Sequence, residues 1–112
     1  MSHDEDELVR RLIATLAKTR SVLREYGVDG WARKLTTHLR AIQNRDVNGL
    51  LALRNAFGTM GALNDVCICP ENGHRIAKED VGSVNNQLQG LTADLRSLSR
   101  RVTKPMLRRI RA

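Results

Sequence analysis

Aromatic side chains are scarce in this sequence of 112 residues, because Tyr26, Trp31 and Phe57 are the whole set and make up 3% of the chain. The core must therefore be built from leucine, isoleucine, valine and alanine, a composition that favours helices packed through aliphatic faces. Long apolar runs are also missing, and none approaches the roughly 18 residues that a membrane-spanning helix requires. The acidic start, residues 4–7, differs from the basic start of a secretory signal peptide. We expect a cytoplasmic protein with no membrane span.

Cysteine is limited to Cys67 and Cys69, which a single residue separates. Such a pair is poorly placed for a structural disulfide, and a reducing compartment keeps both residues as thiols. Because a free cysteine behaves as a small hydrophobic residue, we expect both side chains to be buried.

Acidic residues are absent from the C-terminal end. From position 96 onward the chain has seven basic residues and no acidic one, which leaves twelve of each sign in positions 1–95. The whole net charge of +7 therefore belongs to that end, and an electrostatic partner must meet it there. The basic residues are Arg96, Arg100, Arg101, Lys104, Arg108, Arg109 and Arg111.

Apolar residues recur at intervals of three and four in two early segments, which predicts two amphipathic helices. The first ends at Gly27, and the second begins at Asp29, which we expect to cap it. So short a connection makes the two helices antiparallel neighbours. The apolar positions are Val9, Leu12, Leu16, Leu23 and Tyr26 in the first helix, and Trp31, Leu35, Leu39 and Ile42 in the second.

Two further helices are predicted after position 46. Asp46 is expected to cap a short one that ends at Gly58, and the last carries an unbroken seven-residue seam that Pro105 is expected to end. Gly90 lies off the seam, where it marks either the close approach of another backbone or simple tolerance. The apolar positions are Leu50, Leu53, Ala56 and Phe57 in the short helix, and Val81, Val84, Leu88, Leu91, Leu95, Leu98 and Val102 in the seam.

These patterns predict an all-α fold, an antiparallel helical bundle of three long helices and one short. An ordered motif loop is expected before the last helix. Residues 1–104 form a single helical domain in this interpretation, and residues 105–112 form a basic C-terminal tail.

The motif loop, residues 57–74, interrupts the helical patterns with glycines, an Asn-Asp pair, a short apolar run and a turn signal. The short polar side chains of Asn64 and Asp65 can form hydrogen bonds with neighbouring backbone amides, which would fix the conformation of the loop. Residues 66–69 are expected to be extended, and Asn72 and Gly73 to close them with a turn.

In its order of residues this segment resembles a family of small bacterial proteins known only as a domain of unknown function. The resemblance covers residues 8–102 and rests on Trp31, on Phe-Gly-x-Met-Gly-x-Leu-Asn-Asp at positions 57–65, and on Asn-Gly-His at positions 72–74. It implies a shared fold and a bacterial cytoplasmic origin, and it carries no activity, substrate or cofactor. In that family aliphatic residues fill the run that holds Cys67 and Cys69 here, which argues against a family-wide role for the thiols.

A metal site is one interpretation of the motif loop. Cys67, Cys69 and His74 offer three zinc ligands, with His38 or His3 as a fourth. The two cysteines are closer in sequence than the paired cysteines of structural zinc sites usually are. We therefore expect no metal and no cofactor.

Catalysis is a second interpretation of the same loop. Asp65 and His74 offer an acid and a base, with the Asn64 amide as a polarising group, in a small hydrolase-like site. No nucleophile, phosphate loop or second carboxylate converges with them in the sequence. We therefore favour a loop-holding role for Asn64 and Asp65, with His74 packed beside a turn.

Two apolar features are open to a structural or a partner-binding role. Trp31 and Met60 suit an interface, but a single tryptophan in a chain so poor in aromatics is more often part of the core, which we favour. The seam of the last helix pairs with the first helix in a monomer or with its own copy in a homodimer.

The sequence therefore indicates a non-enzymatic macromolecule-binding protein of the bacterial cytoplasm, with another protein as its partner and an immunity or antitoxin-like role as its most concrete form. The first alternative is weak, sequence-independent nucleic-acid binding through the basic end, and the second is the hydrolase-like site at Asp65 and His74. The candidate binding residues are Trp31, Phe57, Met60, Asn64, Asp65, Asn72 and His74, and those of the basic end are Arg100, Arg101, Lys104, Arg108, Arg109 and Arg111.

Overall fold

The computed structural model describes residues 3–57 and 62–111, with side chains for residues 4–57 and 62–104. Its four α-helices are α1 (His3–Glu25), α2 (Asp29–Gln43), α3 (Val47–Arg54) and α4 (Val81–Arg111). Three short 3₁₀ turns, η1 (Leu63–Asp65), η2 (Pro70–Asn72) and η3 (Lys78–Asp80), lie between α3 and α4. The described residues contain no strand, so the all-α prediction is confirmed.

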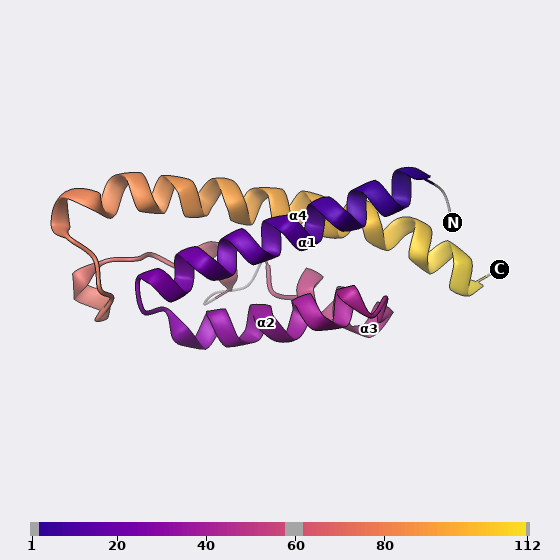
Figure 1. Cartoon of the computed structure of the whole chain (residues 1–112), viewed down its shortest axis with the longest axis horizontal. Coiled ribbons are helices and arrows are strands. Elements are labelled where there is room, and N and C mark those ends of the chain that lie inside the picture. The colour runs from indigo at the N-terminus through magenta and orange to yellow at the C-terminus, as the bar shows by residue number, and fades with distance from the viewer. Residues whose placement is uncertain (1–2, 58–61, 112) are drawn as a thin grey trace.

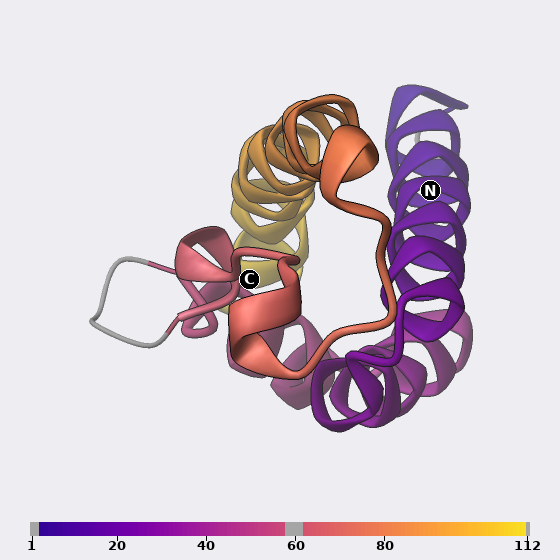
Figure 2. The ribbon, with the colours of Figure 1, turned by 90° about the vertical axis from the view of Figure 1, so that its left-hand side faces the viewer.

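Helices α1 and α4 lie side by side along the 51 Å length of the molecule and run in opposite directions (Figure 1). Helix α2 turns back along α1, and α3 follows it and packs against both α2 and α4. The chain from η2 to the start of α4 crosses the end of the molecule at which α1 passes into α2 (Figure 2). A backbone hydrogen bond fixes this crossing, because the Arg75 N–H donates to the Tyr26 carbonyl at 2.9 Å.

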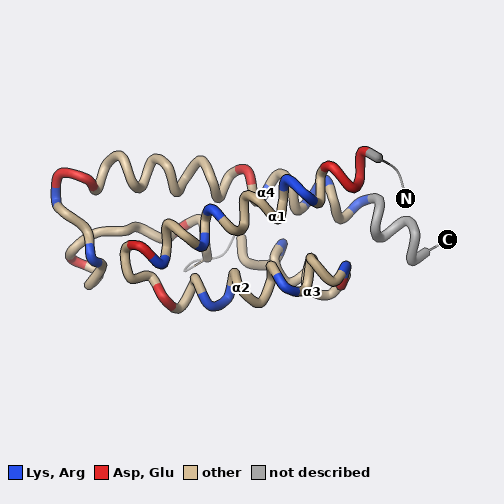
Figure 3. Tube along the Cα trace, viewed as in Figure 1, with Lys and Arg blue, Asp and Glu red and all other residues tan. Residues whose placement is uncertain are grey.

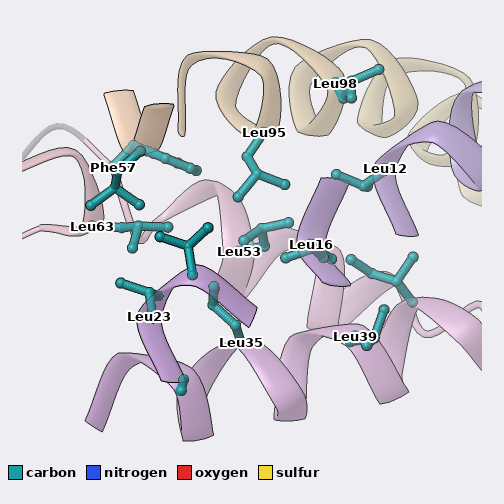
Figure 4. Packing of buried hydrophobic residues seen from close by; sticks show 14 of the residues in the cluster. Leu12, Leu16, Leu23, Leu35, Leu39, Leu53, Phe57, Leu63, Leu95 and Leu98 are labelled. Carbon is teal, nitrogen blue, oxygen red and sulfur yellow. The ribbon is translucent and has the colours of Figure 1, made fainter. Parts of the chain in front are cut away.

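One aliphatic core joins all four helices and the segment between α3 and α4 (Figure 4). Burying a leucine side chain stabilises a fold by about 2 kcal/mol, so the fully buried residues dominate the stability. They are Leu12, Leu16, Leu23, Leu35, Leu50, Leu53, Leu63, Ile68, Leu88 and Leu95. The helical spacing read from the sequence selects most of this core. Tyr26 and Trp31, both expected to be apolar helix positions, are partly buried and pack against its edge.

The seven-residue seam of α4 is buried against the chain's own helices, chiefly α1 and α3. Five of its seven positions are buried and two, Val81 and Leu91, are half-buried. The polar residues Thr92, Ser99 and Thr103 are buried beside the seam, and their hydroxyls donate to backbone carbonyls three or four residues earlier. Packing of the seam against helices of the same chain therefore explains the seven-residue apolar pattern of α4.

The helix boundaries follow local chemistry in three places. Gly27, the expected end of the first helix, has φ +81° just after α1, a conformation that glycine adopts without strain. Asp46 caps α3 as predicted, because its carboxylate accepts from the Asn48 N–H at 2.9 Å. The prediction that Asp29 caps α2 is wrong. Val28 occupies the cap position without a side-chain bond, and Asp29 is the first helical residue, where its charge still favours the positive end of the helix dipole.

Pro105 does not end the last helix, which continues to Arg111. A proline removes the hydrogen bond to the carbonyl four residues earlier and leaves the rest of the backbone ladder in place. Val102 and Thr103, which immediately precede it, are buried and anchor the helix against the body of the molecule. The prediction of a break at Pro105 is therefore wrong, and residues 105–111 continue α4.

Gly49 lies at a tight contact between α3 and α2. A Cβ atom added to Gly49 would overlap the Cβ of Ala41, so glycine is required by the packing of the two helices. At Gly90 an added Cβ would meet no atom within 4 Å, so tolerance rather than close approach explains that glycine. Helix α3 ends at Arg54, and the expected end at Gly58 lies outside the described residues.

Candidate functional site

The segment between η1 and η2 has extended backbone angles at its two ends, Val66 and Cys69, in agreement with the prediction from the sequence. Ile68 lies at its centre and is fully buried. The Ile68 N–H donates to Asn85 Oδ1 at 2.7 Å, and Asn85 Nδ2 donates to the Ile68 carbonyl at 2.8 Å. A single side chain of α4 therefore satisfies both backbone groups of the residue that anchors the loop in the core.

A turn follows this segment at the predicted place. Gly73 has φ +79°, and its N–H donates to the Pro70 carbonyl at 2.9 Å. Asn72 Nδ2 donates to the Cys67 carbonyl at 3.0 Å, and His74 Nδ1 accepts from the Cys69 N–H at 3.2 Å. Asn72 and His74 thus hold the loop together from within.

The expectation that both cysteines are buried is wrong for Cys67, which is exposed, while Cys69 is half-buried. Successive side chains of an extended segment point to opposite sides, so the burial of Ile68 places both cysteines toward the outside. In the described part of the chain, no three or more His, Cys, Asp or Glu side chains are grouped so as to hold a metal ion.

A hollow of about 260 Å³ lies between the loop and the start of α2. It brings together four of the predicted residues: Trp31, Asp65, Asn72 and His74. Cys67 lines the same hollow, so a thiol lies beside the acid and the imidazole that the catalytic interpretation required. The remaining lining residues are Val28, Ala62 and Val66.

The hydrogen bond at His74 limits the acid–base chemistry that is available in this hollow. Because Nδ1 accepts from the Cys69 N–H, the neutral ring carries its proton on Nε2. In that tautomer neither ring nitrogen is free to take a proton from a thiol or from water. A general base at His74 therefore requires loss of a bond that holds the loop, which disfavours the hydrolase-like interpretation.

Trp31 is half-buried. This degree of burial is intermediate between that of a core residue, the role that we favoured, and that of a residue exposed at an interface. Its ring packs against the edge of the core, and Lys34 Nζ lies 4.5 Å from the ring centroid on the outer side. Of the other predicted residues, Phe57 is buried, Asn64 is exposed on η1, and Met60 lies outside the described residues.

A second site, which we call the arginine face, consists of Arg54 on α3 and of Arg96, Arg100 and Arg101 on α4, all exposed. It borders two hollows that share Arg96 and Arg100. The larger, about 760 Å³, is lined by Asn64, Gln89, Thr92, Ala93, Arg96, Ser97, Arg100 and Arg101. The smaller, about 200 Å³, is lined by Leu51, Arg54, Asn55, Phe57, Arg96, Ser99 and Arg100.

The arginine face lies where α3 packs against the second half of α4. Along α4 the described basic residues all fall in that half (Figure 3). Lys104 extends the arginine face along α4 and is exposed. The backbone of the remaining basic residues, Arg108, Arg109 and Arg111, belongs to α4, and their side chains are outside the described part of the structure.

Sequence reasoning missed two residues that shape these sites. Arg54 faces the α4 arginines across a hollow, and only the packing of α3 on α4 reveals this. Asn85 was hidden among polar residues between Val84 and Leu88 on a helix. Asn85 directly follows Val84 of the seam, so helical spacing could have placed it at the edge of the buried face, where it is half-buried in the structure.

The chain is similar over residues 24–77 to a family model described as a domain of unknown function (DUF6966). The match covers slightly less than half of the chain, from the end of α1 to the end of the motif loop. It agrees with the expected resemblance to a family with no assigned activity. A search of curated proteins and a search of solved structures each found no match. Within the described residues, none of the helices combines the length and apolar character needed to cross a membrane.

Proposed function

We propose that this is a non-enzymatic binding protein of the bacterial cytoplasm that docks an acidic partner protein on the arginine face, with an immunity or antitoxin-like role as the most concrete form. The observation that carries the proposal is the pair of adjoining hollows that share Arg96 and Arg100. Arg54 reaches the same place from a different helix.

The two hollows of the arginine face have a positive lining, and Asp94, an exposed acidic neighbour of Arg96 on α4, lines neither of them. All twelve acidic residues lie in the described part of the chain, and none lines either hollow. The ion pairs Arg10–Glu7 and Arg45–Asp6 involve residues outside the arginine face. Like charges held close together repel one another, so an acidic surface placed against them removes an unfavourable interaction and adds favourable ones.

Guanidinium groups suit carboxylates, because their planar donors bind both oxygens at once. Exposed ion pairs contribute only about 0.2–1 kcal/mol each, so four arginines alone give a weak complex. The smaller hollow adds apolar surface, chiefly from the half-buried Leu51. A partner that places an apolar side chain there, surrounded by carboxylates, gains both kinds of interaction.

The distribution of aromatic residues favours a protein over a nucleic acid. Binding of single strands without sequence preference uses aromatic side chains on which bases stack. Phe57 is buried, and Tyr26 and Trp31 lie where α1 passes into α2, at the other end of the molecule (Figure 1).

Purification of the tagged full-length protein from its native host tests the proposal. We expect one or more stoichiometric protein partners whose retention falls as salt rises, and protection against a toxin encoded beside the gene. Recovery of no protein partner, together with no protection against any neighbouring toxin, would refute the proposal. The genomic neighbourhood identifies the toxin to test.

A second function, sequence-independent nucleic-acid binding, is favoured by the continuation of α4 through Pro105. Arg96, Arg100 and Lys104 follow one another at intervals of four and so share one face of that helix. Truncation after Lys104 removes three arginines and leaves the seam intact. If the truncated chain folds but is no longer retained by nucleic acid at low salt, this function is supported. If neither form is retained at low salt, it is wrong.

A further inference from the structure

We propose that Cys67 and Cys69 together form a two-sulfur site that binds one soft monovalent metal ion, Cu(I). The site lies on the motif loop, and the hollow beside Cys67 shares no lining residue with the two hollows of the arginine face. The proposal does not depend on the docking function.

The geometry begins with the extended backbone between η1 and η2. In such a segment residues i and i+2 lie on the same side, about 6.6 Å apart along the chain. The buried side chain of Ile68 fixes which side faces the core, so both cysteines lie on the opposite side. Cys67 is exposed and Cys69 half-buried, which leaves the pair accessible from solvent.

The loop holds this pair of thiols in place before any ligand arrives. Asn85 binds the N–H and the carbonyl of Ile68, His74 accepts from the Cys69 N–H, and Asn72 donates to the Cys67 carbonyl. The Cys69 carbonyl accepts from the Asn72 N–H at 3.2 Å and from the His74 N–H at 3.3 Å. All three residues of the Cys-Ile-Cys unit are therefore fixed by bonds from outside the unit, which reduces the ordering needed when a ligand binds.

The number of donors selects the metal. Zinc takes four ligands in structural sites, and in the described residues no third His, Cys, Asp or Glu joins the pair in a group that could hold an ion. The bond from the Cys69 N–H occupies His74 Nδ1. A d¹⁰ monovalent ion prefers soft thiolates and is satisfied by two of them in a near-linear arrangement. Two thiols each lose a proton on binding, and the metal keeps its oxidation state.

Binding of Cu(I) depends on pH because each thiol must lose its proton before it can act as a ligand. Protons therefore compete with the metal, and the affinity for Cu(I) should rise as pH rises.

The test is an anaerobic titration of the reduced full-length protein with Cu(I) held by bicinchoninate, whose colour reports the free metal. We expect one Cu(I) per chain and no new dimer on size exclusion. Cys67→Ser and Cys69→Ser should each lower the affinity by at least about a hundredfold, because each removes a direct ligand. Trp31, which lines the hollow beside Cys67, should lose fluorescence as the site fills.

Two variants on α4 separate a built site from a pair of ordinary thiols. Asn85→Ala removes the bonds to Ile68 and keeps both cysteines, so we expect about a tenfold loss of affinity. Asn86→Ala, an exposed neighbour, should leave the affinity unchanged. A complex of two chains per Cu(I), equal affinity in either serine variant, or equal affinity in a folded Asn85→Ala protein would each overturn the proposal. If Asn85→Ala does not fold, the affinities of the Cys67→Ser and Cys69→Ser variants, whose substitutions lie outside the core, support or overturn the proposal.

Discussion

The amide of Asn85 takes the place of a neighbouring strand for Ile68, because it accepts from the Ile68 N–H at 2.7 Å and donates to the Ile68 carbonyl at 2.8 Å. Its Nδ2 also donates to the Val81 carbonyl at 2.7 Å, one turn earlier in α4. The motif loop is thus joined to the last helix by one side chain, which also positions the two cysteines on either side of Ile68.

Asn85→Ala should destabilise the protein by about 2–3 kcal/mol, because it leaves a donor and an acceptor of Ile68 without partners near the core. Urea unfolding followed by circular dichroism measures the change. The matched control Asn86→Ala removes an exposed amide from the adjacent position and should change stability by less than about 0.5 kcal/mol. Equal stability of the two variants would show that the bonds to Ile68 are not important.

Gly49→Ala should destabilise the protein by about 1–3 kcal/mol, because the new methyl group overlaps the side chain of Ala41 and forces α2 and α3 apart. Gly90→Ala is the control, since it adds the same methyl group to a helix where space is open. It should stabilise the protein by up to about 1 kcal/mol through helix propensity alone. Adding Ala41→Gly to Gly49→Ala should recover part of the loss, and no recovery would argue against the contact.

His38 should make the protein less stable as pH falls. Partial burial lowers its pKa, a hydrogen bond to the Gly49 backbone opposes this, and Lys34 adds to the lowering. The unfolded chain therefore takes up a proton first, at its ordinary pKa of about 6.5. Stability is complete above that pH and is lost as pH falls toward the lower pKa of the folded state.

His38→Gln removes this contribution, so the loss of stability between about pH 8 and pH 5 should be smaller in the variant than in the parent chain. Denaturant midpoints measured across that range test the prediction. An identical pH dependence in the two proteins would mean that His38 does not have a lowered pKa.

Pro105→Ala should raise both the helical circular dichroism signal and the free energy of unfolding, the latter by about 1–3 kcal/mol. The alanine restores a donor within α4 and removes the clash of the proline ring. In a separate, non-helical tail the same substitution would change neither quantity. That result would contradict the continuation of α4 through this position.

The sequence predicted the helices because aliphatic residues at three- and four-residue spacing have few other stable arrangements. The seam of α4, the Asp46 cap and the turn at Gly73 are local features of this kind, and each appears in the structure where it was expected. The predicted break at Pro105 is wrong because a local preference was weighed without the tertiary packing. The free-energy cost of one proline is smaller than the stabilisation that α4 gains by packing against the body of the molecule.

The candidate sites were harder to predict because they depend on which helices meet. Arg54 and Arg96 are distant in sequence, and their shared hollow exists only because α3 packs against α4. The exposure of Cys67 depends on which side of an extended segment faces the core, and the burial of Ile68 decides that. The composition correctly located the excess positive charge, but the α3 arginine that completes the face lies outside the basic end.

The most direct test of the docking function compares charge reversal on the arginine face with the same charge change elsewhere. The double variant Arg96→Glu with Arg100→Glu alters the two arginines that both hollows share, and Arg33→Glu with Arg40→Glu alters two exposed arginines of α2. Affinity for the partner recovered from the native host is measured for both, after folding is checked and nucleic acid is removed with nuclease. We predict that the first variant loses at least about tenfold in affinity and that the second binds as the parent does. Equal affinity in the two variants, or a partner lost on nuclease treatment, would contradict docking of a protein on the arginine face.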